Sequence, residues 1–144
     1  MSDQQMRGLD GIENEEPRSA RAYILKGAFE LAVTKAIYKE TRKGGTAVII
    51  DFEIVTSTNE ARPVGTTTTR YFDLGAERSG RGEVRDCIAK LYGAELSEVT
   101  GDVIKLAVSE KQPLIGKRVK CIATVTATKS GGEWTHCDWI TLKE

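Results

Sequence analysis

The clearest pattern in the chain is an alternation of apolar and polar residues between Thr46 and Thr56. The residues on one side of this stretch are all apolar: Val48, Ile50, Phe52 and Ile54. Asp51 and Glu53 fall on the other side. Successive side chains of a β-strand point to opposite faces, so this period of two predicts a strand with one face on a core and one near water.

Four further stretches have the composition of strands: residues 22–38, 66–74, 116–129 and 133–142. The first is rich in β-branched and aromatic residues, and Gly27 interrupts it, as a glycine does where a strand bulges or bends. Its Ala, Leu and Glu residues are also compatible with a helix, but the β-branched content favours a strand. Glycine pairs predict turns at residues 39–45 and 130–132.

Between the third and fourth predicted strands the period changes. Val84, Cys87, Ile88 and Leu91 have the spacing i, i+3, i+4, i+7. This spacing predicts a helix over Gly82–Tyr92 with one apolar stripe, ended by Gly93. A weaker helical pattern covers residues 97–108.

Three strands, a helical segment and two strands are the element order of the OB-fold, a five-stranded Greek-key barrel. We therefore expect a mainly β protein with an OB-fold barrel and a helical segment between strands 3 and 4. An SH3-like barrel also has five strands, but it does not easily accommodate some forty residues between strands three and four. A split α+β sheet stays open as an alternative.

The totals describe one globular domain. The chain has 144 residues, of which 40% are hydrophobic and 29% charged, and a net charge of zero. Residues 1–22 are polar and lack an apolar period, so we expect a flexible N-terminal leader there and an OB-fold domain over residues 23–144. The leader contains three arginines and five acids, namely Asp3, Asp10, Glu13, Glu15 and Glu16. The remainder therefore has a slight positive excess.

Cysteine usage and hydropathy predict the compartment. Cys87, Cys121 and Cys137 are widely spaced, odd in number and without a CxxC pair, which indicates a reduced intracellular protein. No apolar stretch approaches the ~18 residues of a membrane span. The expectation is a soluble cytoplasmic protein that does not contact a membrane.

Several stretches resemble the OB-fold single-stranded-DNA-binding proteins of bacteriophages. They are Tyr23–Phe29, Gly44–Ile54, Gly65–Leu74, Pro113–Val119 and Thr126–Trp134 with Asp138-Trp139, and the likeness covers residues 22–143. The resemblance implies sequence-nonspecific binding of single-stranded DNA, which would be coated and protected during phage replication or recombination. It also implies a non-enzymatic protein, cytoplasmic in the infected host. Many such proteins end in an acidic tail, whereas here the acidic segment is N-terminal. We expect this leader to compete with DNA for the groove or to recruit a replication partner.

Single-strand binding needs cations for phosphates and aromatic faces on which bases stack. Three places in the sequence combine them, and the OB-fold uses these strands and loops for ligands. The candidate nucleic-acid-binding residues are Tyr38, Lys39, Arg42 and Lys43 at the first turn, Arg70 and Tyr71 on the third strand, and Lys129 and Trp134 at the last turn. Each has a plainer interpretation: solvated hairpin charges, an ion pair of Arg70 with Asp51 or Glu53, and Trp134 capping the barrel. A possible homodimer would cover open strand edges.

No catalytic motif is present, and we expect no catalytic residue, cofactor or metal. A site of Cys121, His136 and Cys137 is disfavoured, because adjacent residues on a strand point to opposite faces. The main alternative function is an OB-fold protein-interaction module within a replication or recombination complex, which the zero net charge and the acids Asp51 and Glu53 favour. A metal-dependent nuclease is a third and weaker alternative.

Overall fold

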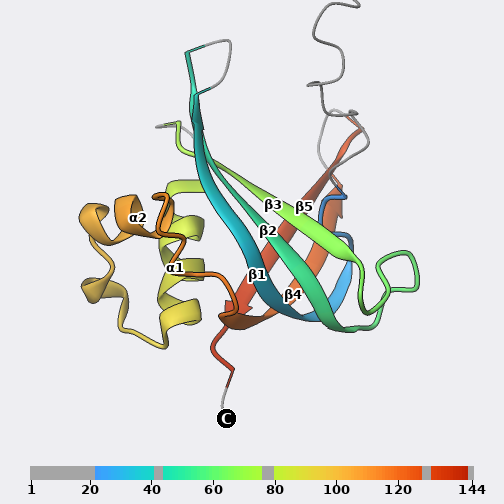
Figure 1. The fold of residues 1–144 in the computed structure, drawn as a ribbon. Helices are drawn as coiled ribbons and strands as arrows, with labels where there is room; N and C mark the ends of the chain where they lie inside the picture. Colours follow the sequence, from blue (N-terminus) through green and yellow to red (C-terminus); the bar gives the residue numbers. More distant parts are fainter. Residues whose placement is uncertain (1–21, 41–43, 76–79, 128–130, 143–144) are drawn as a thin grey trace, which may run out of the picture.

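Five strands form one antiparallel sheet in the order β3-β2-β1-β4-β5 (Figure 1). The computed structural model describes residues 22–40, 44–75, 80–127 and 131–142. The strands are β1 (Gly27–Glu40), β2 (Thr46–Ser57), β3 (Thr67–Asp73), β4 (Arg118–Ala127) and β5 (Glu133–Ile140). Between β3 and β4 the chain forms α1 (Gly80–Tyr92), a 3₁₀ helix (Leu96–Glu98) and α2 (Gly101–Ala107). The predicted mainly β class and element order are confirmed.

The first predicted strand is wrong in its bounds. It was expected over residues 22–38, but β1 begins at Gly27 and continues through Lys39 and Glu40, which were assigned to a turn. Gly27 has a φ of 150°, a conformation that favours glycine, and the chain changes partner there. Before Gly27 the chain pairs with β3, and after it with β2 and β4.

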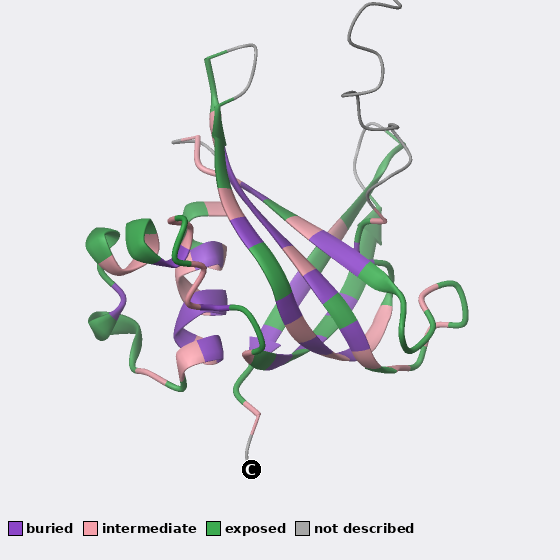
Figure 2. Cartoon of the chain, in the orientation of Figure 1, coloured by how far each residue is buried: buried purple, intermediate pink, exposed green. Residues whose placement is uncertain are grey.

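The core lies between the inner face of the curved sheet and helix α1 (Figure 2). Val84, Cys87, Ile88 and Leu91 are all buried, so the predicted apolar stripe of the helix is confirmed. From β5, Trp139 stacks on Phe52 with ring centroids 5.7 Å apart. Helix α1 packs against β3, β4 and β5. The helix thus covers the end of the sheet where its two edge strands approach each other.

Strict alternation fails at two places. Ala47 and Ile49 are 0% and 1% exposed although they lie on the outer face of β2. Val125 shares the face of the buried Val119, Cys121 and Ala123, but it is 37% exposed because it lies near the end of β4. Val48, Ile50, Phe52 and Ile54 of β2 follow the predicted pattern, because all four are buried.

The sheet is not closed, because β3 and β5 are its two edge strands. In the described part of the chain, one side chain spans the seam between them: Arg70 of β3 donates from Nη2 to the carbonyl oxygen of Thr135 in β5 at 3.2 Å. The edge of β3 is also covered by Ala22–Ile24, which runs parallel to it. Among the described residues, the Arg70 side chain therefore bridges the seam, and the Ala22–Ile24 segment covers part of the β3 edge.

Candidate nucleic-acid interface

The outer face of β1, β2 and β3 has two exposed tyrosines at one edge. Tyr71 of β3 is 39% exposed and lies beside Ile49 of β2, which in turn lies beside Ile37 of β1. Tyr23 is 50% exposed and lies abreast of Thr69, two residues before Tyr71 on the same face of β3. Paired residues of parallel strands point to the same side, so Tyr23 and Tyr71 are neighbours on this outer face.

The backbone around Tyr23 is held firmly. Thr69 donates its N–H to the carbonyl oxygen of Ala22 at 2.9 Å and accepts from the N–H of Ile24 at 3.2 Å. Arg62 Nε donates to the carbonyl oxygen of Tyr23 at 3.0 Å. Ile24 is 4% exposed and anchors the segment in the core. The Tyr23 ring is therefore mounted on an ordered backbone, as a stacking surface requires.

Two lysines lie at the other edge of the same face. Lys35 is in register with Asp51 and Lys39 with Ala47, and both lysines are exposed. Within the described ranges neither forms an ion pair. We call the surface made by Tyr23, Tyr71, Lys35 and Lys39 the outer platform. Strands lie about 4.8 Å apart, so the tyrosines and lysines are separated by about 10–15 Å.

The floor of the outer platform is closely packed. It consists of Thr69, Ile49 and Ala47, each at most 4% exposed. The acids near it are partly engaged: Asp51 accepts from Thr69 Oγ1 at 2.6 Å, and Asp73 accepts from the N–H of Gly75 at 2.8 Å. These hydrogen bonds offset part of the repulsion that carboxylates exert on phosphate.

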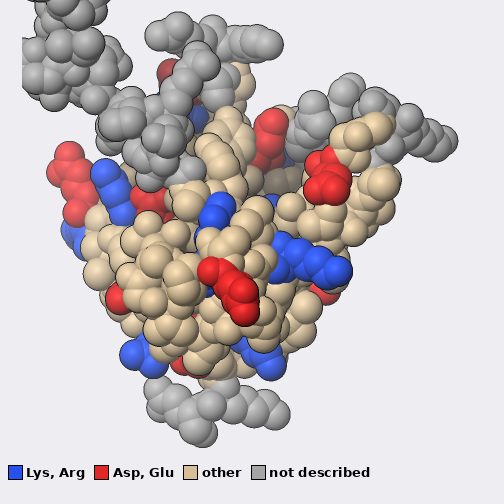
Figure 3. Space-filling model, turned by 90° about the vertical axis from the view of Figure 1, so that its right-hand side faces the viewer, with Lys and Arg blue, Asp and Glu red and all other residues tan. Residues whose placement is uncertain are grey.

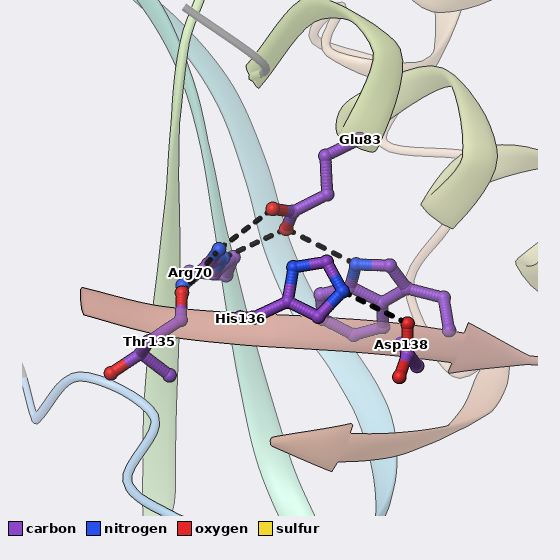
Figure 4. Close-up of polar contacts among 6 residues, drawn as sticks. Arg70, Glu83, Thr135, His136 and Asp138 are labelled. Carbon is purple, nitrogen blue, oxygen red and sulfur yellow. Dashed lines mark hydrogen bonds and ion pairs between the residues drawn. The ribbon is translucent and has the colours of Figure 1, made fainter. Parts of the chain in front are cut away.

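Arg70 lies on the inner face, where its guanidinium group contacts Glu83 and Thr135 (Figure 4). Its Nε and Nη2 donate to the two carboxylate oxygens of Glu83 at 2.8 and 2.7 Å, and the Trp139 indole N–H donates to the same carboxylate at 3.2 Å. Burial alone would lower the pKa of Arg70, but the hydrogen bond and the charge of Glu83 raise it above its ordinary value. The sequence left open that Arg70 forms an ion pair instead of binding DNA. The structure shows such an ion pair, but its partner is Glu83 and not Asp51 or Glu53. Arg70 therefore joins β3, α1 and β5 rather than facing outward.

Trp134 lies on the outer face of β5, across from Thr126 of β4. It is 48% exposed, and its ring is 5.5 Å from that of His136. His136 Nε2 is 3.1 Å from Asp138 Oδ1. Thr135, the residue after Trp134, is the one that Arg70 reaches, so Trp134 borders the same seam as Tyr71.

Tyr38 lies on the opposite face from Lys39. It is in register with Val48 on the inner face, and its ring is 48% exposed at the mouth of a cavity of about 960 Å³ between the sheet and the helices. The alternation of β1 separates these two residues, although they are adjacent in sequence.

The structure thus divides the predicted residues. Lys39 and Tyr71 share one face, Trp134 lies beyond the seam, and Tyr38 and Arg70 lie on the inner face. Arg42, Lys43 and Lys129 lie outside the described residues. Sequence reasoning missed Tyr23, which it treated only as the start of a strand, and Lys35. The alternation Lys35, Ile37, Lys39 could have indicated the second lysine.

The charged groups of the visible face are interspersed rather than gathered into a basic band (Figure 3). No group of three or more histidines, cysteines or acids among the described residues is arranged to hold a metal ion.

Cys87, Cys121 and Cys137 are free and buried. Burial raises the pKa of Cys87, and a hydrogen bond with Cys137 together with burial raises that of Cys121, so both stay protonated at neutral pH. In the part of the chain that is described, no helix has the length and apolarity needed to cross a membrane.

Comparison with known proteins finds no matching family model and no matching curated sequence.

Proposed function

We propose that the protein is a non-enzymatic, sequence-nonspecific single-stranded-DNA-binding protein of the OB type, and that the strand lies on the outer platform. The observation that carries the proposal is that two exposed tyrosines and two exposed lysines lie on the same outer face of β1, β2 and β3. Bases stack on aromatic rings, and lysines replace the counterions of phosphates. In OB-fold proteins this region of strands two and three is the usual binding surface.

The sheet order supports the OB assignment. A five-stranded Greek-key barrel opened between its third and fifth strands has the neighbour order β3-β2-β1-β4-β5. The Arg70 bridge and the Ala22–Ile24 segment lie at that seam. By this account the protein coats and protects exposed strands in replication or recombination, in phage as the sequence resemblance implies.

The proposal is tested by fluorescence anisotropy of a labelled oligo-dT with a Tyr23→Ala/Tyr71→Ala variant. One base–aromatic stack contributes about 1–3 kcal/mol, so we expect the affinity to fall at least about tenfold. The matched control is Tyr38→Ala, which removes a tyrosine of similar exposure from the opposite face and should leave the affinity unchanged. A Tyr23→Phe/Tyr71→Phe variant keeps both rings and should bind like the parent. Equal binding by the folded double alanine variant would contradict the proposal.

A second candidate function is a protein-interaction module in a replication or recombination complex. The zero net charge and the acids Asp51, Glu53 and Asp73 on the outer face favour it. Contacts of that kind depend less steeply on salt than phosphate contacts do. Binding of a protein partner that is insensitive to salt, together with no binding of oligo-dT, would favour this function.

A further inference from the structure

The cavity at Tyr38 is a groove with an aliphatic interior and a basic rim. We call it the helix-side groove, because α1 and α2 form one wall and the ends of β1, β2 and β3 form the other. Its described aliphatic lining residues are Val48, Leu74, Val84, Val99, Ile104 and Val108. Most of them are buried or partly buried members of the core or packed against it. This interior can accept aliphatic side chains.

The described lining of the groove includes three cations: Arg81 and Arg85 from α1 and Lys105 from α2. Arg85 is fixed by a hydrogen bond from its Nε to the carbonyl oxygen of Val99 at 2.8 Å. No acid is among the described lining residues, and the nearby Glu83 turns away to Arg70. Within the described ranges Arg81 and Lys105 form no ion pair. The rim is therefore complementary to carboxylates.

We propose that the helix-side groove binds the acidic N-terminal segment of the same chain, residues 9–16. This segment reads Leu-Asp-Gly-Ile-Glu-Asn-Glu-Glu and combines two aliphatic side chains with four carboxylates. Leu9 and Ile12 match the aliphatic interior, and the acids match the rim. A nucleic-acid strand matches it less well, because the described lining residues offer a single aromatic ring, that of Tyr38, and few polar partners for bases.

The length of the connection is sufficient. Ala22 is tied to β3 beside Thr68, whose Oγ1 donates to its carbonyl oxygen at 2.8 Å. Leu74, at the near wall of the groove, lies six residues along from Thr68, or about 20 Å at the rise of a strand. The six residues from Glu16 to Ala22 can also extend about 20 Å. The segment can therefore reach the groove without releasing Ala22 from β3.

Paramagnetic relaxation enhancement in the full-length chain tests the proposal. A spin label is attached at Gly8→Cys, and labelling is selective because Cys87, Cys121 and Cys137 are at most 4% exposed. We expect the amide signals of Ile104 and Val108 to broaden. An Arg81→Glu/Lys105→Glu variant should reduce that broadening at least twofold, because it reverses two rim charges.

The matched control is Lys111→Glu/Lys120→Glu, which makes the same change in net charge at exposed lysines outside the groove and should keep the broadening. Absence of broadening at the groove, or equal broadening in the rim variant, would overturn the proposal. So would broadening seen only when a labelled chain is mixed with an isotope-labelled, spin-free chain, because the segment would then come from another copy. These readouts involve no DNA and are independent of the proposed function.

Discussion

Glu83 is the residue on which the seam between β3 and β5 depends. Its carboxylate accepts three hydrogen bonds, two from Arg70 and one from Trp139. The side chains of Arg70 and Glu83 are only 15% and 14% exposed, so an unpaired arginine there would be poorly solvated.

Replacing Glu83 by Gln removes the charge and keeps one acceptor oxygen. We expect the free energy of unfolding to fall by about 2–3 kcal/mol, less than for a fully buried pair because both side chains keep some exposure. Urea unfolding measures the change, with Glu110→Gln as a control at an exposed position. A loss as small as that of the control would show that the Arg70–Glu83 pair contributes little to stability.

At the residue scale, the sequence predicts the face of a strand on which a side chain lies better than it predicts the ion-pair partner of that side chain. Alternation along β3 places Arg70 on the face of the buried Phe72, and in the structure Arg70 lies on that inner face. The ion-pair partner is Glu83, thirteen residues further on in a helix, because the acids of β2 lie on the outer face. The position of a helix over a sheet depends on packing between distant segments, which local pattern does not contain.

At the scale of elements, α1 begins where it does because Gly80 lies directly against the end of β3. A Cβ at Gly80 would overlap the carbonyl oxygen of Asp73 and lie 2.6 Å from its backbone nitrogen. Gly82, two residues further along the same helix, has open space around it. Substitution of Gly80 therefore reports the effect of close packing against β3, whereas substitution of Gly82 reports the effect of helix propensity.

We expect Gly80→Ala to destabilise the fold by about 1–3 kcal/mol, because the helix must move away from β3. Gly82→Ala should stabilise it by up to about 1 kcal/mol, because alanine is the better helix former. Thermal or urea unfolding of the two variants measures both changes. If both substitutions stabilise the protein equally, the close approach of α1 to β3 is wrong.

Element order was predictable, and element ends were less so. The five strands and the first helix follow from periods of two and of 3.6 residues. The switch of partner at Gly27 was not predicted, since a glycine in an apolar run fits a bulge within one strand as well as a change of neighbour. For the same reason Tyr23 was not recognised as part of the candidate site.

At the scale of the whole molecule, the net charge is zero. Binding to nucleic acid therefore requires a surface that is locally basic. The outer platform supplies two lysines, and nearby carboxylates are partly engaged by hydrogen bonds. The affinity predicted from this arrangement is modest in its ionic part and rests substantially on stacking by Tyr23 and Tyr71. Salt dependence can therefore count the phosphate contacts made by the platform.

The salt dependence of oligo-dT binding tests the central claim most directly, when the parent is compared with a Lys35→Gln/Lys39→Gln variant. For single strands the slope of log affinity against log salt is about −0.7 per phosphate contact, so removing both lysines should make it shallower by about 1.4. Lys111→Gln/Lys120→Gln, which removes two exposed lysines away from the platform, should keep the parent slope. Failure of the parent to bind oligo-dT at low salt, or equal slopes for the parent and the platform variant, would contradict the account.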